Sequence, residues 1–212
     1  MSRLRVALAK GRLYEPSVER FRLAGAAPDA DAGRRLLIPS SDPAIEFLVV
    51  KPGDVPVYVE SGAADLGVTG TDVVRESNAD VLEPLELGFG FCRLVVASPE
   101  VAPYPLLPGG ITARVATKYP RLAHAHSAAA GRPVDIIQVN GSVEVAPLLN
   151  LSHWIVDLVD TGNTLRANGL VERETILTCG AILVANRASQ KLKLDAFLDL
   201  MGRLERAGNG GG

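Results

Sequence analysis

Short apolar segments alternate with helical segments along most of the chain, and this alternation limits the folds open to it. In the first third, residues 4–9, 35–38, 45–50 and 66–68 read as strands. Helical spacing follows the first strand and ends at Gly25, and a second helix ends near Gly62. The resulting order of strands and helices predicts an α/β fold with a mainly parallel sheet.

A second strand–helix series lies inside the first. Its predicted strands, at residues 113–117, 134–139 and 155–159, lie between two further apolar strands at 94–97 and 181–185. We assign those two flanking strands to the first series, so the chain must cross twice between two lobes. The prediction is a two-lobed protein with its active site in the cleft between the lobes. Lobe I comprises residues 1–98 and 180–212, and lobe II comprises residues 99–179.

The composition excludes several classes of protein. Apolar residues make up 47% of the 212 residues, charged residues 22%, and the net charge is −2. These values are typical of a globular protein and argue against a disordered chain, a membrane protein or a nucleic-acid-binding protein. The apolar run at 6–9 is too short for a signal peptide. Cys92 and Cys179 do not have the spacing of a metal-binding motif, so we expect both to be buried thiols. Such thiols suit a cytoplasmic location, although a disulfide between the two cysteines stays an open alternative.

The segment IVDLVDTGNTLRANGL, residues 155–170, is the strongest functional candidate. An apolar strand carrying Asp157 and Asp160 runs into a turn that opens a helix, and the turn consists of Thr161, Gly162, Asn163 and Thr164. Free backbone N–H groups at a helix start bind phosphate, and carboxylates suit ribose hydroxyls or Mg²⁺. The pattern therefore predicts a sugar-phosphate site. An ordinary capped helix start is the alternative.

Basic residues follow or precede two strands of lobe I. Lys10, Gly11 and Arg12 come directly after the first strand, at the end where α/β proteins bind ligands. Two cations around a glycine suit a polyphosphate, or they belong to a solvated loop. Arg34 and Arg35 open the second strand, and at most one of them is expected to face a ligand.

Other candidates are weaker. Residues 140–144 repeat the strand–loop–helix design, which places Glu144 in a first helical turn, and residues 69–72 have the same pattern in lobe I. His124 and His126 are two residues apart, which does not favour metal binding on a helix, so we expect them to be exposed. The sequence contains no nucleophile elbow, Walker motif or Rossmann glycine fingerprint.

Taken in order, several segments make the chain similar to the catalytic subunit of ATP phosphoribosyltransferase, the enzyme that opens histidine biosynthesis. The matching segments are VALAKGRL (6–13), DVPVYVESGAADLGVTGTDV (54–73), LELGFGFCRLVVA (85–97), RVATKYP (114–120), NGSVEVAPLL (140–149) and IVDLVDTGNTLRANGLVERETIL (155–177). The resemblance implies a fold like the type II periplasmic binding proteins. It also implies condensation of ATP with 5-phosphoribosyl 1-diphosphate, in the presence of Mg²⁺, to N1-(5-phosphoribosyl)-ATP and diphosphate.

The resemblance also implies roles for the candidate residues. The turn from Thr161 to Thr164 would hold the 5-phosphate, while Asp157 and Asp160 would contact the ribose hydroxyls or Mg²⁺, with Glu144 nearby. Arg12 and Arg34 would face the diphosphate. Independently of the resemblance, we expect Lys10 to assist them and Gly11 to contact the substrate.

We expect no C-terminal regulatory domain, which is the pattern of the short form of the family. That form acts with a regulatory subunit resembling histidyl-tRNA synthetase in a hetero-oligomer. The match weakens at residues 101–110 and 122–132, which puts contacts with the partner in doubt more than the chemistry. A bilobed solute-binding module and a phosphoribosyltransferase for another acceptor are the competing hypotheses.

Overall fold

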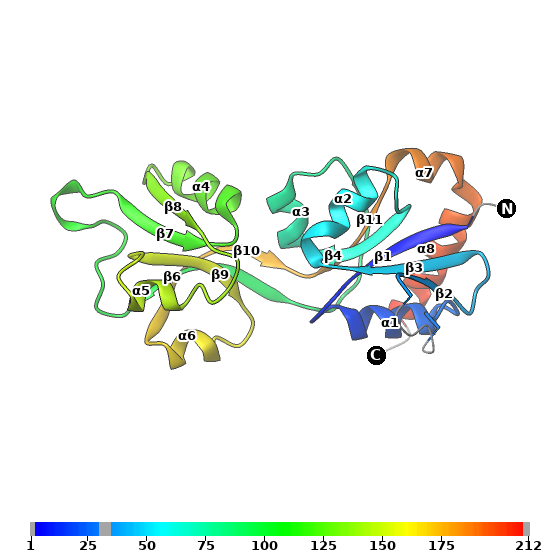
Figure 1. Cartoon of the computed structure of the whole chain (residues 1–212), viewed down its shortest axis with the longest axis horizontal. Coiled ribbons are helices and arrows are strands. Elements are labelled where there is room, and N and C mark those ends of the chain that lie inside the picture. Colours follow the sequence, from blue (N-terminus) through cyan, green and yellow to red (C-terminus); the bar gives the residue numbers. More distant parts are fainter. Residues whose placement is uncertain (1–2, 30–34, 210–212) are drawn as a thin grey trace. The chain divides into compact units, whose positions relative to one another are not determined.

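The computed structural model describes residues 3–29 and 35–209, and the chain forms two compact units. Unit 1 consists of Met1–Gly90 and Gly180–Gly212, and unit 2 of Phe91–Cys179 (Figure 1). The described part of the chain contains no helix that is long and apolar enough to cross a membrane.

Unit 1 is built on a mixed sheet with six strands among the described residues, in the order β2-β3-β1-β4-β11-β5. β1 is parallel to β3 and β4, whereas β2, β11 and β5 run antiparallel to their neighbours. The strands are β1 Leu4–Ala9, β2 Leu37–Pro39, β3 Ile45–Val50, β4 Leu66–Gly70, β5 Leu82–Glu86 and β11 Ala181–Ala185. The helices are α1 Tyr14–Leu23, η1 Pro52–Asp54, α2 Val55–Glu60, α3 Thr71–Ser77, α7 Arg187–Leu192 and α8 Leu194–Asn209.

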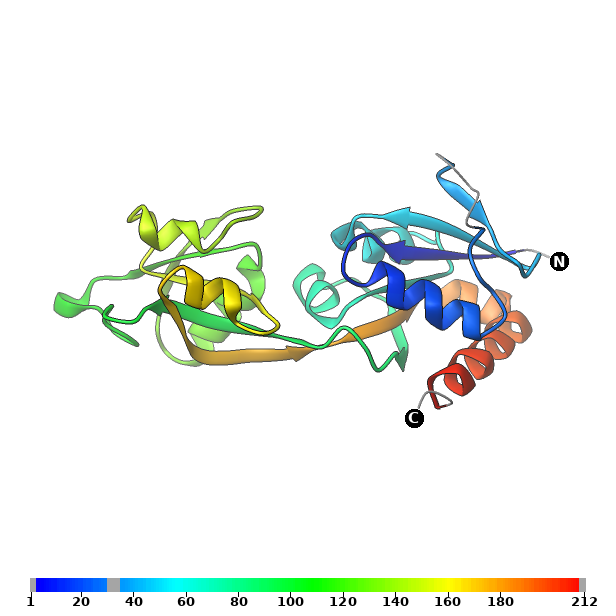
Figure 2. The same ribbon diagram turned by 90° about the horizontal axis from the view of Figure 1, so that it is seen from below.

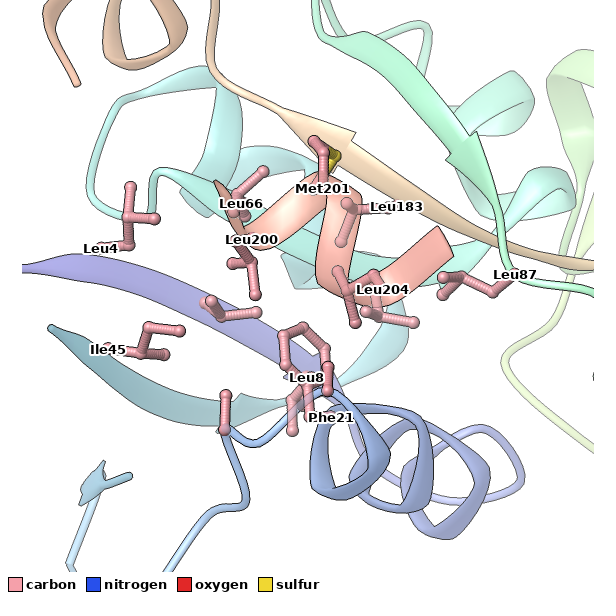
Figure 3. Close-up of a cluster of buried hydrophobic side chains, with 14 of the residues drawn as sticks. Leu4, Leu8, Phe21, Ile45, Leu66, Leu87, Leu183, Leu200, Met201 and Leu204 are labelled. Atoms are coloured by element: carbon pink, nitrogen blue, oxygen red, sulfur yellow. The ribbon is translucent and has the colours of Figure 1, made fainter. Parts of the chain in front are cut away.

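Helices cover both faces of the unit 1 sheet. On one face α1 and α8 lie side by side, and Phe21, Leu200 and Leu204 pack on Leu8 and its neighbours (Figures 2 and 3). On the other face α2 lies directly against β4. A side chain at Gly67 would come within 2.6 Å of a Val55 methyl group, so glycine is required for this close packing.

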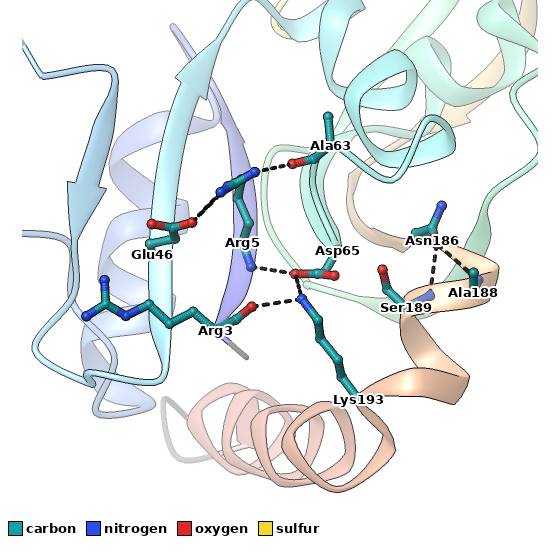
Figure 4. Close-up of polar contacts among 9 residues, drawn as sticks. All are labelled: Arg3, Arg5, Glu46, Ala63, Asp65, Asn186, Ala188, Ser189 and Lys193. Carbon is teal, nitrogen blue, oxygen red and sulfur yellow. Dashed lines mark hydrogen bonds and ion pairs between the residues drawn. The ribbon is translucent and has the colours of Figure 1, made fainter. Parts of the chain in front are cut away.

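Polar contacts join the ends of several unit 1 elements (Figure 4). The buried carboxylate of Asp65 accepts the Arg5 backbone N–H at 2.8 Å and contacts the Lys193 ammonium at 2.7 Å. The same ammonium donates to the Arg3 carbonyl at 2.8 Å. Asp65 precedes β4, and Lys193 lies between α7 and α8, so one carboxylate ties β1, β4 and the C-terminal helices together.

Unit 2 is built on a second mixed sheet, with five strands among its residues, in the order β10-β6-β9-β7-β8. β7 is parallel to β8 and β9, and β6 is antiparallel to β9 and β10. The strands are β6 Cys92–Pro99, β7 Ala113–Thr117, β8 Val134–Gln138, β9 Trp154–Val159 and β10 Leu170–Cys179. The helices are η2 Pro108–Gly110, α4 Pro120–Ala129, α5 Val145–Leu148 and α6 Asn163–Ala167.

The structure differs from the sequence prediction at the first boundary between the units. The strand predicted at 94–97 was assigned to lobe I with the boundary after residue 98, but β6 pairs with β9 and β10 and belongs to unit 2. An apolar run is suited to the interior of either sheet, so its pattern does not reveal which sheet contains it. The unit 1 sheet is also less parallel than predicted, because β11 and β5 complete it in the antiparallel direction.

Candidate phosphoribosyl site

The predicted sugar-phosphate residues of unit 2 gather at one edge of its sheet. Because β8, β7 and β9 are parallel, their carboxyl ends meet at this edge, where α/β proteins bind ligands. Lys118 follows β7, Glu144 lies in the loop after β8, and the 160–164 turn follows β9. The structure thus brings the candidates Glu144 and the 160–164 turn to one edge, together with Lys118.

The 160–164 turn is held in shape by a glycine and an arginine. Gly162 has a φ of 75°, a left-handed conformation that favours glycine. The Arg166 side chain donates to the Thr161 carbonyl at 3.2 Å and to the Asn163 side-chain oxygen at 2.6 Å. Thr161, Asn163 and Thr164 are exposed, so their hydroxyl and amide groups can reach a ligand. Gly162, the N-cap residue of α6, has no side chain to cap the helix, and the Thr161 hydroxyl accepts the Asn163 N–H at 3.4 Å, as in an ordinary capped start.

Asp157 lies at the same edge but is largely buried, with 14% of its side chain exposed. Its Oδ1 accepts the Leu158 backbone N–H at 2.8 Å and lies 3.2 Å from the Lys118 ammonium. Burial raises the pKa of the Asp157 carboxyl, and the nearby Glu144 charge adds to the rise, while Lys118 and the Leu158 N–H oppose it. Lys118 and the Leu158 N–H thus both favour the ionised form of this carboxyl group.

Lys118 is a residue of this edge that sequence reasoning did not single out. Its backbone is fixed by the buried Thr117 hydroxyl, which donates to the Val156 carbonyl at 2.7 Å and accepts the Tyr119 N–H at 2.8 Å. The Lys118 ammonium also lies 5.5 Å from the centre of the Tyr119 ring. Two signals in the sequence could have identified it: its position directly after a predicted strand, and its place in the segment RVATKYP (114–120).

The basic candidates belong to unit 1. Lys10, Gly11 and Arg12 are exposed after β1, and Gly11 has a φ of 85°. Arg12 donates to the Gly90 carbonyl at 2.7 Å. This bond holds the Arg12 guanidinium beside Gly90, the last residue of the first chain segment of unit 1. Arg34 lies outside the described residues.

Residues 69–72, the weaker unit 1 candidate, are oriented inward. Thr69 and Asp72 are buried, and the Thr69 hydroxyl donates to the Pro52 carbonyl at 3.3 Å. The Thr71 hydroxyl donates to the Gly180 carbonyl at 3.0 Å. These hydroxyl groups therefore support the fold of unit 1 and do not present a surface for a ligand.

The prediction that His126 is an exposed helix residue is wrong. Its Nε2 lies 2.7 Å from Glu174, whose carboxylate also accepts two bonds of 2.8 Å from Arg132. Arg132 donates as well to the Tyr104 hydroxyl at 3.1 Å. The Arg132 bond lowers the pKa of Glu174 to about 2, and burial raises the pKa of Tyr104 to about 12. This network joins the end of α4 to β10 and is structural.

Comparison with known proteins decides which family these features belong to. The family model described as "ATP phosphoribosyltransferase" matches residues 51–206. The chain belongs to the ATP phosphoribosyltransferase family. A relative of that name from Sorangium cellulosum is 49% identical over 211 residues, which cover 99% of this chain and 98% of the relative. Another from Caldanaerobacter subterraneus is 47% identical, with coverage of 97% and 98%. The family resemblance found in the sequence is thus confirmed, and with it a phosphoribosyltransferase enzyme.

Solved structures of the family and of other proteins confirm the fold class. The ATP phosphoribosyl transferase (HisG:HisZ) complex from Thermotoga maritima contains a chain with a TM-score of 0.85 and 30% identity, covering 96% of this chain and 98% of that one. The periplasmic aliphatic sulphonate binding protein SsuA from Escherichia coli has a TM-score of 0.60 at 12% identity, covering 98% of this chain and 72% of that one. The second likeness concerns the fold alone, and it agrees with the predicted type II periplasmic-binding-protein-like fold.

Proposed function

We propose that this protein condenses ATP with 5-phosphoribosyl 1-diphosphate to N1-(5-phosphoribosyl)-ATP and diphosphate, the first step of histidine biosynthesis. Family membership supports the reaction. The observation that carries the proposal in this chain is the meeting of the 160–164 turn with Asp157 at the carboxyl edge of the unit 2 sheet. An amide-rich turn beside acids suits a phosphorylated pentose.

The turn binds the 5-phosphate in this proposal. The backbone N–H groups of the α6 start and the hydroxyls of Thr161 and Thr164 are donors, and Gly162 allows the left-handed turn that presents them. Asp157 accepts hydrogen bonds from the ribose hydroxyls, with Asp160 and Glu144 beside it. These contacts orient the sugar so that its anomeric carbon faces the acceptor.

The chemical difficulty lies in the departure of diphosphate. N1 of neutral adenine needs no proton removed before it attacks, so the reaction requires no strong general base. The anomeric carbon gains positive character and the diphosphate gains negative charge as the bond between them breaks. We assign Arg12 and Arg34, assisted by Lys10 and the Gly11 backbone, to stabilisation of this leaving group.

Mg²⁺ is proposed as the metal ion of the reaction. Within residues 3–29 and 35–209 no group of three or more acidic, histidine or cysteine residues is arranged to hold a metal ion. Mg²⁺ binds by one or two carboxylates together with substrate phosphates, and Asp157 and Asp160 fit that smaller requirement. Asp160 is the exposed member of the pair, whereas Asp157 already contacts a lysine. The ion would supply positive charge to the diphosphate.

We also propose a partner and a compartment. The Thermotoga maritima protein is part of a HisG:HisZ complex, and this chain is similar to it over nearly its full length. By analogy, a regulatory subunit resembling histidyl-tRNA synthetase would join this chain in a hetero-oligomer. Two buried free cysteines suit a reducing cytoplasm.

The proposal is tested by incubating the purified chain with ATP, 5-phosphoribosyl 1-diphosphate and Mg²⁺, with and without the regulatory subunit, and detecting the products. We expect N1-(5-phosphoribosyl)-ATP and diphosphate in equal amounts. Binding of a ligand without its consumption would identify a solute-binding module instead. Turnover with another nucleobase but not with ATP would identify a different phosphoribosyltransferase.

A further inference from the structure

The acids of the unit 2 site create an electrostatic problem for an anionic ligand. Asp157, Asp160 and Glu144 all lie at the edge that is proposed to bind a sugar phosphate. Carboxylates at the same edge repel a phosphate dianion, and the repulsion is strongest where burial removes water. Only 14% of the Asp157 side chain is exposed, whereas Asp160 is exposed, so water screens the charge of Asp157 less than that of Asp160.

Lys118 supplies the opposite charge at that position. Its ammonium lies 3.2 Å from Asp157 Oδ1, and 39% of the Lys118 side chain is exposed against 14% for Asp157. The lysine is thus the more exposed member of this pair. It also sits at the end of β7, which pairs directly with β9 through Thr117 and Val156.

The residues on either side of Lys118 in the sequence, Thr117 and Tyr119, hold it in place. The Thr117 hydroxyl bonds to β9 and to the Tyr119 N–H, which determines the path of the backbone through Lys118. Tyr119 is buried in the unit 2 core, and the lysine ammonium lies over its ring at 5.5 Å. Asp157 is fixed in turn, because its Oδ1 accepts the Leu158 N–H. An exposed surface ion pair lacks such supports.

We propose that Lys118 is a positioning residue of the sugar-phosphate site. It holds the Asp157 carboxylate in the orientation that accepts ribose hydroxyls, and it neutralises that carboxylate so that the donor's phosphate groups can bind beside it. Leu158 and Lys118, the contacts that this carboxylate makes within the described part of the chain, both involve Oδ1, so Oδ2 is assigned to the ribose. This inference rests on the proposed function and adds to it a residue that acts through Asp157.

The test is equilibrium binding of ribose 5-phosphate, measured by titration calorimetry on the full chain. We expect Lys118→Met to weaken binding roughly 10-fold, since the largely buried Asp157 carboxylate loses the nearby Lys118 charge but solvent screens part of the loss. Lys118→Arg keeps the charge and should stay within about 3-fold of the wild type. Lys191→Met, an exposed lysine of unit 1, should bind as the wild type does.

A double-mutant cycle with Asp157→Asn separates positioning from direct contact. If Lys118 acts through Asp157, Lys118→Met changes affinity by less than about 2-fold in the Asp157→Asn background. An undiminished effect there would show that Lys118 binds the ligand itself and would overturn the inference. In turnover, Lys118→Met should raise KM for the donor sugar while kcat changes by less than about 3-fold.

The controls distinguish this inference from the proposed function. Circular dichroism checks that each variant folds, and Lys118→Gln replaces Lys118→Met if the latter does not. Wild-type protein that binds ribose 5-phosphate but forms no N1-(5-phosphoribosyl)-ATP would refute the proposed reaction and leave the inference standing. Equal affinity of wild type and Lys118→Met would refute the inference alone.

Discussion

At the scale of single residues, Gly162 is where backbone conformation and ligand binding meet. Its φ of 75° is in the left-handed region, and a side chain there would lie 3.1 Å from the Arg166 guanidinium that holds the turn. We predict that Gly162→Ala raises KM for the donor sugar by roughly 10-fold or more, because both the turn and Arg166 must shift. Initial-rate kinetics measure this effect.

Gly169 provides a matched control for that change. It has a φ of 67° in the same unit, but a side chain there would meet nothing within 4 Å. Gly169→Ala should lower the free energy of unfolding by about 1 kcal/mol, as Gly162→Ala should, yet leave KM unchanged. Equal KM values for the two variants would show that the turn at 162 has no special role in binding.

Arg12 tests the assignment of the leaving-group residues. If it stabilises departing diphosphate, Arg12→Ala should lower kcat by about 10²–10³-fold with both substrates saturating, as expected for the loss of one preorganised donor. Arg206→Ala, an exposed arginine on α8, serves as the control and should keep its kcat. Unchanged turnover for Arg12→Ala would remove Arg12 from the mechanism.

The roles of residues could be predicted from the sequence where neighbouring residues form a recognisable motif. The order of acids, threonines and glycine at 157–164 marks a strand, a turn and a helix start, and all of these lie within one short segment. Lys118 was missed because its significance depends on Asp157, which meets it only through the pairing of β7 with β9. His126 was misjudged for the same reason, since Glu174 reaches it from β10.

At the scale of elements, the Glu174 network fastens the end of α4 to the edge strand β10. The pKa of Glu174, about 2 when folded, lies below its ordinary value of 4.5. Its ionised form therefore stabilises the fold above pH 4.5, and this contribution is lost as pH falls towards 2. We predict that Glu174→Gln costs about 1 kcal/mol at pH 7, after allowance for solvent screening of a partly exposed group.

Urea unfolding at several pH values measures this linkage. The stability difference between wild type and Glu174→Gln should shrink as pH falls from about 4.5 towards 2, because protonation removes the same charge. Glu100→Gln, a change at an exposed acid of the same unit, should show no such trend. A difference that stays constant over this range would contradict the assigned role of Arg132 and Glu174.

The contact between Asp65 and Lys193 joins β1, β4 and the C-terminal helices of unit 1 (Figure 4). Among the described residues, removal of the lysine leaves the Arg5 N–H as the one close donor to this buried carboxylate. We predict that Lys193→Met lowers the free energy of unfolding by about 2 kcal/mol, and that Lys191→Met changes it by less than about 0.5 kcal/mol. Chemical denaturation monitored by circular dichroism checks both values, and equal stability of the two variants would contradict this account.

At the scale of the whole molecule, much of the α/β organisation could be predicted from the sequence. The strands expected at 113–117 and 181–185 agree with β7 and β11, because each is a compact apolar run bounded by turns. The sequence did not reveal β10, whose polar residues, such as Glu172 and Glu174, suit a half-exposed edge strand and interrupt any apolar run. It also misassigned β6, since pairing between strands distant in sequence decides which sheet holds an apolar segment.

The central claim is that the 160–164 turn of unit 2 binds the phosphate of a phosphorylated pentose. A crystal structure of the protein with 5-phosphoribosyl 1-diphosphate tests it most directly. We expect the 5-phosphate oxygens to accept hydrogen bonds from the backbone N–H groups and hydroxyls of Thr161–Thr164, and a ribose hydroxyl to donate to Asp157. A 5-phosphate bound elsewhere on the chain, with this turn empty, would contradict it.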